Sequence, residues 1–135
     1  MGDRVVPIVP VLLNTYFHPN QPTPGRCYRL GRALRQAIEA WPTARRVGIV
    51  ASGGLSHFFV DEALDGRVLE LLAKKDVDGI AALPPAQLES GNSEIRNWLA
   101  AAGALEHLDM QVVDYVPCYR SEAGTGVGMA FAVWR

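Results

Sequence analysis

Apolar residues of this chain recur at helical spacing in some segments and resemble strands in others, which limits the chain to a mixture of helices and strands. Residues 26–41 and 61–75 carry apolar side chains three and four positions apart, which indicates amphipathic helices. Residues 112–119 and 127–134 have the apolar, β-branched character of strands, and a glycine-rich segment joins them. These patterns predict an α/β fold, with a mixed β-sheet flanked by helices.

Four further segments complete the predicted order, which is β-α-β-α-α-α-β-β. The apolar run 5–13 contains two prolines that cannot donate ladder hydrogen bonds, so it predicts an edge strand or an irregular one. Residues 46–51 are apolar and precede Ser-Gly-Gly, which is typical of a buried strand that ends in a tight turn. Residues 76–83 and 93–104 predict two more helices.

Length and composition narrow the class of protein. The 135 residues suit a single domain spanning 1–135. The net charge of −1 gives no field that would attract nucleic acid, and no apolar run is long enough to cross a membrane. Cys27 and Cys118 form no CxxC motif, which favours reduced thiols. We therefore expect a cytoplasmic protein without nucleic-acid or membrane partners.

His57 occupies a position where α/β proteins often place functional groups. It follows the predicted strand 46–51 and the two glycines of ASGGLSH, at the end of a strand. The glycines allow a sharp turn that approaches a ligand closely, and an imidazole exchanges protons near neutral pH. A histidine that caps a helix or is satisfied within the core fits the position equally well.

Glu94 is the carboxylate of most interest, because it lies in the first turn of the predicted helix 93–104, within GNSEIRNW. The helix dipole stabilises a negative charge at this place. The same pattern also matches a capping box with Asn92 or Ser93 as the cap, and without further information this plainer interpretation is favoured.

Two loops contain other candidates for a binding site. His18 lies in the proline-rich loop 14–25, whose fixed backbone is suited to line a pocket. Gly124 belongs to a glycine-rich segment that could bring backbone amides close to an anion, or could simply connect two strands. Its GxGxG spacing differs from the dinucleotide motif GxGxxG, and no helical pattern follows, so we exclude a nucleotide-binding loop.

Four blocks of the sequence carry a resemblance to a known family. They are NTYFHPNQPTP, ASGGLSHFFVDE, SGNSEIRNW and DYVPCYRSEAGTGVGMAFAVW, and the resemblance as a whole runs over about residues 5–134. In this order they resemble the class III extradiol ring-cleaving dioxygenases, which include the β subunit of protocatechuate 4,5-dioxygenase and the gallate enzymes. The resemblance implies the fold of the C-terminal half of the catalytic subunit.

The resemblance also implies roles for particular residues. The family opens catechol-type rings with molecular oxygen at a non-haem iron(II) held by two histidines and one glutamate. Glu94 matches the glutamate ligand, and His57 matches an acid–base histidine that is not a ligand. Ser121 matches a position that binds the carboxylate of the substrate. His18 and Gly124 stay candidates for lining the pocket.

The two ligand histidines of the family lie in its N-terminal half, which has no counterpart here, and His18 matches neither of them. We therefore expect this chain alone to bind iron(II) weakly or not at all. One hypothesis is extradiol cleavage of a carboxylated catechol, such as protocatechuate or gallate, in aromatic catabolism. The chain would then be a truncated copy of a full enzyme, or half of a split one whose partner chain supplies the histidines, and we expect either such a partner or a homo-oligomer. The alternative is an inactive remnant or a non-catalytic scaffold subunit of the same superfamily.

Overall fold

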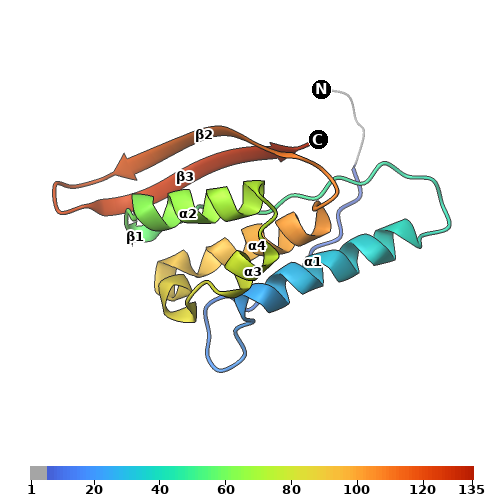
Figure 1. Cartoon of the computed structure of the whole chain (residues 1–135), viewed down its shortest axis with the longest axis horizontal. Coiled ribbons are helices and arrows are strands. Elements are labelled where there is room, and N and C mark those ends of the chain that lie inside the picture. The colour runs from blue at the N-terminus through green and yellow to red at the C-terminus, as the bar shows by residue number, and fades with distance from the viewer. Residues whose placement is uncertain (1–5) are drawn as a thin grey trace.

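Residues 6–135 are described by a computed structural model, in which a sheet lies over a group of helices (Figure 1). The helices are α1 (Pro24–Glu39), α2 (Glu62–Ala73), α3 (Val77–Ala81) and α4 (Ile95–Ala104), with two short 3-10 helices, η1 (Pro85–Leu88) and η2 (Ser90–Glu94). The strands are β1 (His57–Phe59), β2 (Met110–Tyr119) and β3 (Thr125–Trp134). No helix within residues 6–135 has both the length and the apolarity needed to cross a membrane.

The strands form an antiparallel sheet in the order β1-β3-β2. β2 and β3 make a long hairpin, and a register shift between Val112 and Asp114 introduces a bulge. The short β1 runs along the other edge of β3, where His57 pairs with Val127. β3 is therefore the central strand, and it places the first residue of β1 within reach of the hairpin.

Side chains of β3 alternate between the helices and the outer face of the sheet. Ala130, Ala132 and Trp134 pack against the buried core, while Phe131 and Val133 between them are exposed. This two-residue period is what a strand with one buried face requires. The helices therefore cover one face of the sheet, and the outer face keeps apolar side chains on its surface.

Helices α1 and α4 cross with their backbones in direct contact. A Cβ atom added at Gly31 would lie 2.0 Å from the carbonyl oxygen of Ala100, and one added at Gly103 would lie 2.0 Å from that of Tyr28. Such distances leave no room for any side chain. The two glycines therefore set the separation of α1 and α4, which carries the start of α4 to its place beside the sheet.

We expect Gly103→Ala to lower the free energy of unfolding by about 1–3 kcal/mol, because the added methyl group forces α1 and α4 apart. Gly66→Ala is the matched control, since Gly66 lies in α2 with open space around its Cβ position. There the better helix propensity of alanine should raise stability by about 0.5–1 kcal/mol. Urea denaturation measures both changes, and equal effects of the two substitutions would contradict this view of the helix contact.

Most of the predicted elements are confirmed, together with the α/β class. The predicted helices 26–41, 61–75, 76–83 and 93–104 correspond to α1, α2, α3 and α4, and the predicted strands 112–119 and 127–134 correspond to β2 and β3. Boundaries differ by a few residues. In α2 the apolar face is buried as its period requires. Within the predicted helix 26–41 the buried residues are instead Cys27, Tyr28 and Gly31, while Ala33 and Ala37 of the predicted apolar face are exposed.

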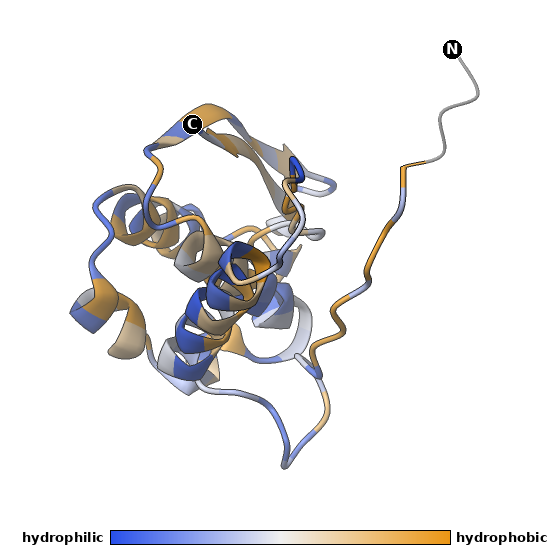
Figure 2. Ribbon diagram, turned by 90° about the vertical axis from the view of Figure 1, so that its right-hand side faces the viewer, coloured by the Kyte–Doolittle hydropathy of each residue, from blue (hydrophilic) through white to orange (hydrophobic). Residues whose placement is uncertain are grey.

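The two other predicted strands are wrong. Residues 46–51 form no strand, and the Val50 side chain is 90% exposed. Of the predicted strand 5–13, residue 5 lies outside the described residues, and residues 6–13 form no strand (Figure 2). A strand needs a neighbour that pairs with its backbone, and within residues 6–135 neither segment has one. The three-residue β1 was missed because it is too short to show a period.

Candidate functional site

The glycine-rich loop before β1 is held by side chains of α4. The indole Nε1–H of Trp98 donates to the carbonyl oxygen of Gly53 at 3.0 Å, and the Asn97 side chain donates to that of Ser52 at 3.1 Å. Gly53 has a φ of +118°, a backbone conformation that favours glycine. Trp98 and Asn97 thus fix the loop that leads into His57.

A buried carboxylate, Asp65 of α2, holds the end of this loop. Its two oxygens accept hydrogen bonds from the Ser56 amide at 2.8 Å, the Ser56 hydroxyl at 2.7 Å and the Tyr115 hydroxyl at 2.7 Å. Burial raises the pKa of the Asp65 carboxyl above its ordinary value, and the hydrogen bonds from Ser56 and Tyr115 offset this only in part. Asp65 therefore ties α2, β2 and the residue before His57 together.

His57 has its imidazole oriented by the loop. Its Nδ1 lies 3.0 Å from the carbonyl oxygen of Leu55. Because a carbonyl oxygen only accepts hydrogen bonds, Nδ1 carries the proton and the lone pair of the neutral ring is on Nε2. This Nε2 is 3.6 Å from Oε2 of Glu94. The two candidates that are 37 residues apart in the sequence therefore face one another.

The Glu94 side chain does not cap α4. Glu94 is the last residue of η2, and no side-chain hydrogen bond caps the start of η2 or of α4. The capping-box interpretation is therefore wrong, and neither Asn92 nor Ser93 serves as the cap. A Cβ atom at Gly53 would lie 2.5 Å from Oε2 of Glu94, so the bare glycine backbone makes room for this carboxylate.

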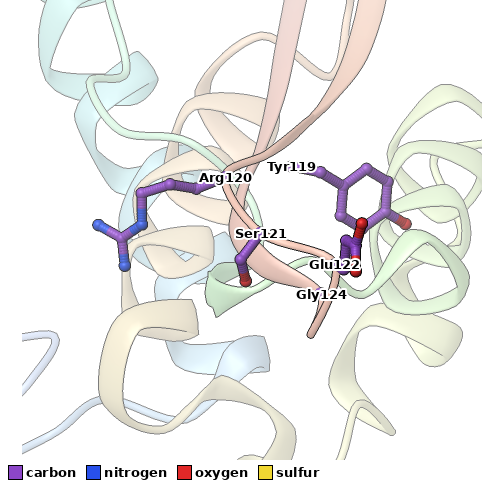
Figure 3. A pocket seen from close by; sticks show the side chains of 5 residues that line it. All are labelled: Tyr119, Arg120, Ser121, Glu122 and Gly124. Carbon is purple, nitrogen blue, oxygen red and sulfur yellow. The ribbon is translucent and has the colours of Figure 1, made fainter.

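Two open hollows lie along β1 and the tip of the hairpin. One, of about 260 Å³, is lined by His57, Phe58, Cys118, Arg120, Gly126 and Val127. The other, of about 480 Å³, is lined by Tyr119, Arg120, Ser121, Glu122 and Gly124 (Figure 3). Arg120 belongs to both hollows, so Ser121 and Gly124 lie in the hollow next to that of His57. The Ser121 hydroxyl is 2.7 Å from the hydroxyl of Thr125.

His18 lies apart from this arrangement. Its Nε2 is 2.9 Å from Oε2 of Glu89, and its side chain is largely exposed. The buried guanidinium of Arg96 holds the loop that carries His18 at two other residues of the loop, Thr15 and Pro22. Arg96 donates to the carbonyl oxygens of Pro22 at 2.9 Å and Thr15 at 3.2 Å, and also to that of Leu88.

Three residues with a part in the site were missed in the sequence. Asp65 had a detectable signal, since it is a charged residue on the apolar face of α2. Asn92 stood in the GNSE block, where it was taken for a helix cap. Arg120 gave no signal, because only the fold places it between His57 and Ser121.

Comparison with known proteins supplies the family. A family model described as the catalytic LigB subunit of aromatic ring-opening dioxygenase matches residues 2–130. The chain belongs to this dioxygenase family. Gallate dioxygenase from Pseudomonas putida is 35% identical to it over 111 residues, which cover 74% of this chain and 32% of that enzyme. The chain thus spans about a third of the length of the curated relative it matches. No solved structure matches it.

Family membership raises the question whether the residues of this chain fit an iron ion. Within residues 6–135 no group of three or more histidine, cysteine, aspartate or glutamate side chains could hold a metal. Glu94 and His57 supply one carboxylate and one imidazole. A single pair leaves most coordination positions of iron(II) without protein donors, so the described residues do not fit the metal by themselves.

The raised pKa of Asp65 leads to a prediction about pH. The contribution of this carboxyl to stability is full below its ordinary pKa, about 3.9, and is lost as the pH rises through the higher pKa of the folded state. The difference in unfolding free energy between the natural chain and Asp65→Asn should therefore shrink as the pH rises above about 4. Urea denaturation across this range measures the difference, with Glu122→Gln at the exposed hairpin tip as the control. Parallel profiles for the natural chain and Asp65→Asn would contradict the prediction.

Proposed function

We propose that this chain is part of an extradiol ring-cleaving dioxygenase, in which it supplies the acid–base histidine and one carboxylate of the active site. The contact between Nε2 of His57 and Oε2 of Glu94, at 3.6 Å, carries this proposal. In a family of ring-opening dioxygenases, a proton acceptor beside a carboxylate is the pair that such a site needs. We further propose a cytoplasmic role in aromatic catabolism, with molecular oxygen as the second substrate.

His57 would act on a hydroxyl proton of the substrate. Its protonated Nδ1 is engaged by Leu55, which leaves the Nε2 lone pair free to accept that proton. The side chain is 27% exposed, and it lines an open hollow, so a ring can reach it. The same nitrogen can return the proton later in the reaction. This is general acid–base catalysis by a positioned imidazole.

The substrate class that we propose is a carboxylated catechol, such as protocatechuate or gallate. Ser121 and Gly124 line the hollow next to that of His57, and Arg120 borders both. A guanidinium that lines both hollows and a hydroxyl that lines one of them suit a carboxylate, since charge-assisted hydrogen bonds are the strong ones. The similarity to a gallate dioxygenase supports the same class, because gallate carries a carboxylate on its ring.

We propose that iron(II) binds only in an assembly, where another chain completes the set of ligands. Glu94 would be the donor from this chain, and two histidines would come from a partner chain of different sequence. Apolar side chains support association, because Ile8 and Leu12 are 83% and 91% exposed, and Val50 is exposed as well. Such side chains are usually covered in a functional assembly.

Light scattering during size-exclusion chromatography tests the association. We expect the measured molar mass to exceed that of a monomer and to rise with protein concentration, because association would bury the exposed apolar side chains of residues 6–13. Exchanging Ile8 and Leu12 for serine should shift the mass toward the monomer. A clean monomer of the natural chain at high concentration would contradict self-association.

A non-catalytic scaffold is the second candidate function. The observation that favours it is the lack of three metal donors within residues 6–135. A chimaera separates the two candidates: this chain replaces the matching third of the Pseudomonas putida gallate dioxygenase. If the chimaera binds iron and consumes oxygen in the presence of gallate, the scaffold candidate is excluded.

Substitutions in the chimaera test the role of each residue. His57→Gln should abolish turnover and leave the iron content nearly unchanged, because it removes only the proton acceptor. Glu94→Ala should lose most of the iron, because it removes a donor. Ser121→Ala should raise KM for gallate more than KM for a catechol without a carboxylate.

Oxygen consumption and iron analysis measure these outcomes. Glu39→Gln serves as the control, because Glu39 is an exposed carboxylate that pairs with Arg35 on α1, lines neither hollow and has no proposed role in turnover or iron binding. Loss of iron in His57→Gln with retention in Glu94→Ala would reverse the two roles and refute the assignment.

A further inference from the structure

We propose that Asn92 is a positioning residue, which sets the distance between His57 and Glu94. Its Oδ1 accepts a hydrogen bond from the backbone amide of His57 at 2.8 Å, and its Nδ2 donates to the carbonyl oxygen of Gln87 at 3.2 Å. Asn92 belongs to η2, two residues before Glu94. One side chain therefore ties the first residue of β1 to the short helix that ends in the carboxylate.

The backbone of η2 at Gly91 lies directly against His57 of β1, with no room for a side chain between them. A Cβ atom added at Gly91 would lie 2.5 Å from Cβ of His57 and 3.2 Å from its carbonyl carbon. Any side chain at position 91 would therefore push η2 away from β1. The missing side chain of Gly91 permits this close approach, and the neighbouring Asn92 accepts the hydrogen bond from the His57 amide that holds the two segments together.

Residues on both sides of this contact have a strained backbone. Phe58, directly after His57, has a φ of 69°, and Ser90, directly before Gly91, has a φ of 54°. Such angles are rare for residues other than glycine and especially for a bulky aromatic residue. A conformation of this kind persists only where the surroundings hold it in place. The Asn92 bond fastens β1 at the residue before the strained Phe58.

Loss of the Asn92 side chain should release this arrangement. The amide of His57 would lose its acceptor, and Phe58 could relax to an ordinary backbone angle. The imidazole would then leave the carbonyl oxygen of Leu55 and no longer point Nε2 at Glu94. Asn97 provides a contrast, because it is the same residue type and bonds the same loop at Ser52 but does not touch His57.

The experiment compares Asn92→Ala, Asn92→Asp and Asn97→Ala in the full chain. Two readouts are followed by NMR: the hydrogen exchange of the His57 amide and the ¹⁵N shifts of the His57 ring, which report its tautomer. Asn92→Ala should speed the exchange by about tenfold, the effect of losing one ordinary hydrogen bond. It should also convert the single Nδ1–H tautomer into a mixture. Asn92→Asp keeps an acceptor oxygen and should preserve both signals, and Asn97→Ala should leave them unchanged.

Unchanged exchange and an unchanged tautomer in Asn92→Ala would overturn the proposal. If Asn92→Ala fails to fold, Asn92→Asp decides, because protection of the His57 amide in that variant supports the role and its loss overturns it. The positioning role of Asn92 does not depend on the proposed function, but its expected effect on turnover does. In the chimaera, Asn92→Ala should lower kcat with iron retained, and Asn92→Asp should restore it. The NMR readouts need neither iron nor turnover, so a failure of the proposed function is distinguishable from a failure of this role.

Discussion

Burial of two charged side chains constrains the loops that form the candidate site. Asp65 and Arg96 are almost fully buried, and a buried charge is costly unless hydrogen bonds compensate it. Asp65 obtains these bonds from Ser56 and Tyr115, and Arg96 obtains them from three backbone carbonyl groups. Each charge thereby fixes a loop that has no regular structure of its own. Ser56 precedes His57, and Arg96 lies two residues after Glu94, so the two constraints meet at the candidate site.

The helix 61–75 and the strand 127–134 could be predicted from the sequence because each has one apolar face against the core. The period of 26–41 predicted the helix but not its buried face, because α1 contacts α4 through Tyr28 and Gly31. The strand predicted for 46–51 was wrong for a reason that no period reveals. Its residues are apolar enough for a strand, but a strand also requires a neighbour, and the described residues provide none. The Val50 side chain is exposed as a result.

The candidate site could be predicted in part. Position and resemblance pointed to His57 and Glu94, and the structure brings their side chains together at 3.6 Å. The positions of Ser121 and Gly124, in a hollow that shares Arg120 with that of His57, agree with a role in binding but do not test it. The contribution of Asn92 is not visible in the sequence, because its partner is a backbone amide 35 residues away. Contacts of this kind depend on the fold and leave no local pattern.

The central claim is that His57 and Glu94 belong to one metal-dependent active site. The most direct measurement is the NMR spectrum of the histidine rings in the chimaera loaded with manganese(II), whose unpaired electrons broaden the signals of nearby nuclei. His107 is exposed and lies just past the end of α4, whereas Glu94 directly precedes the start of that helix. The account predicts that the His57 ring signals broaden beyond detection while those of His107 broaden less, and that Glu94→Ala removes the broadening. Sharp His57 signals in a chimaera with manganese bound would contradict it.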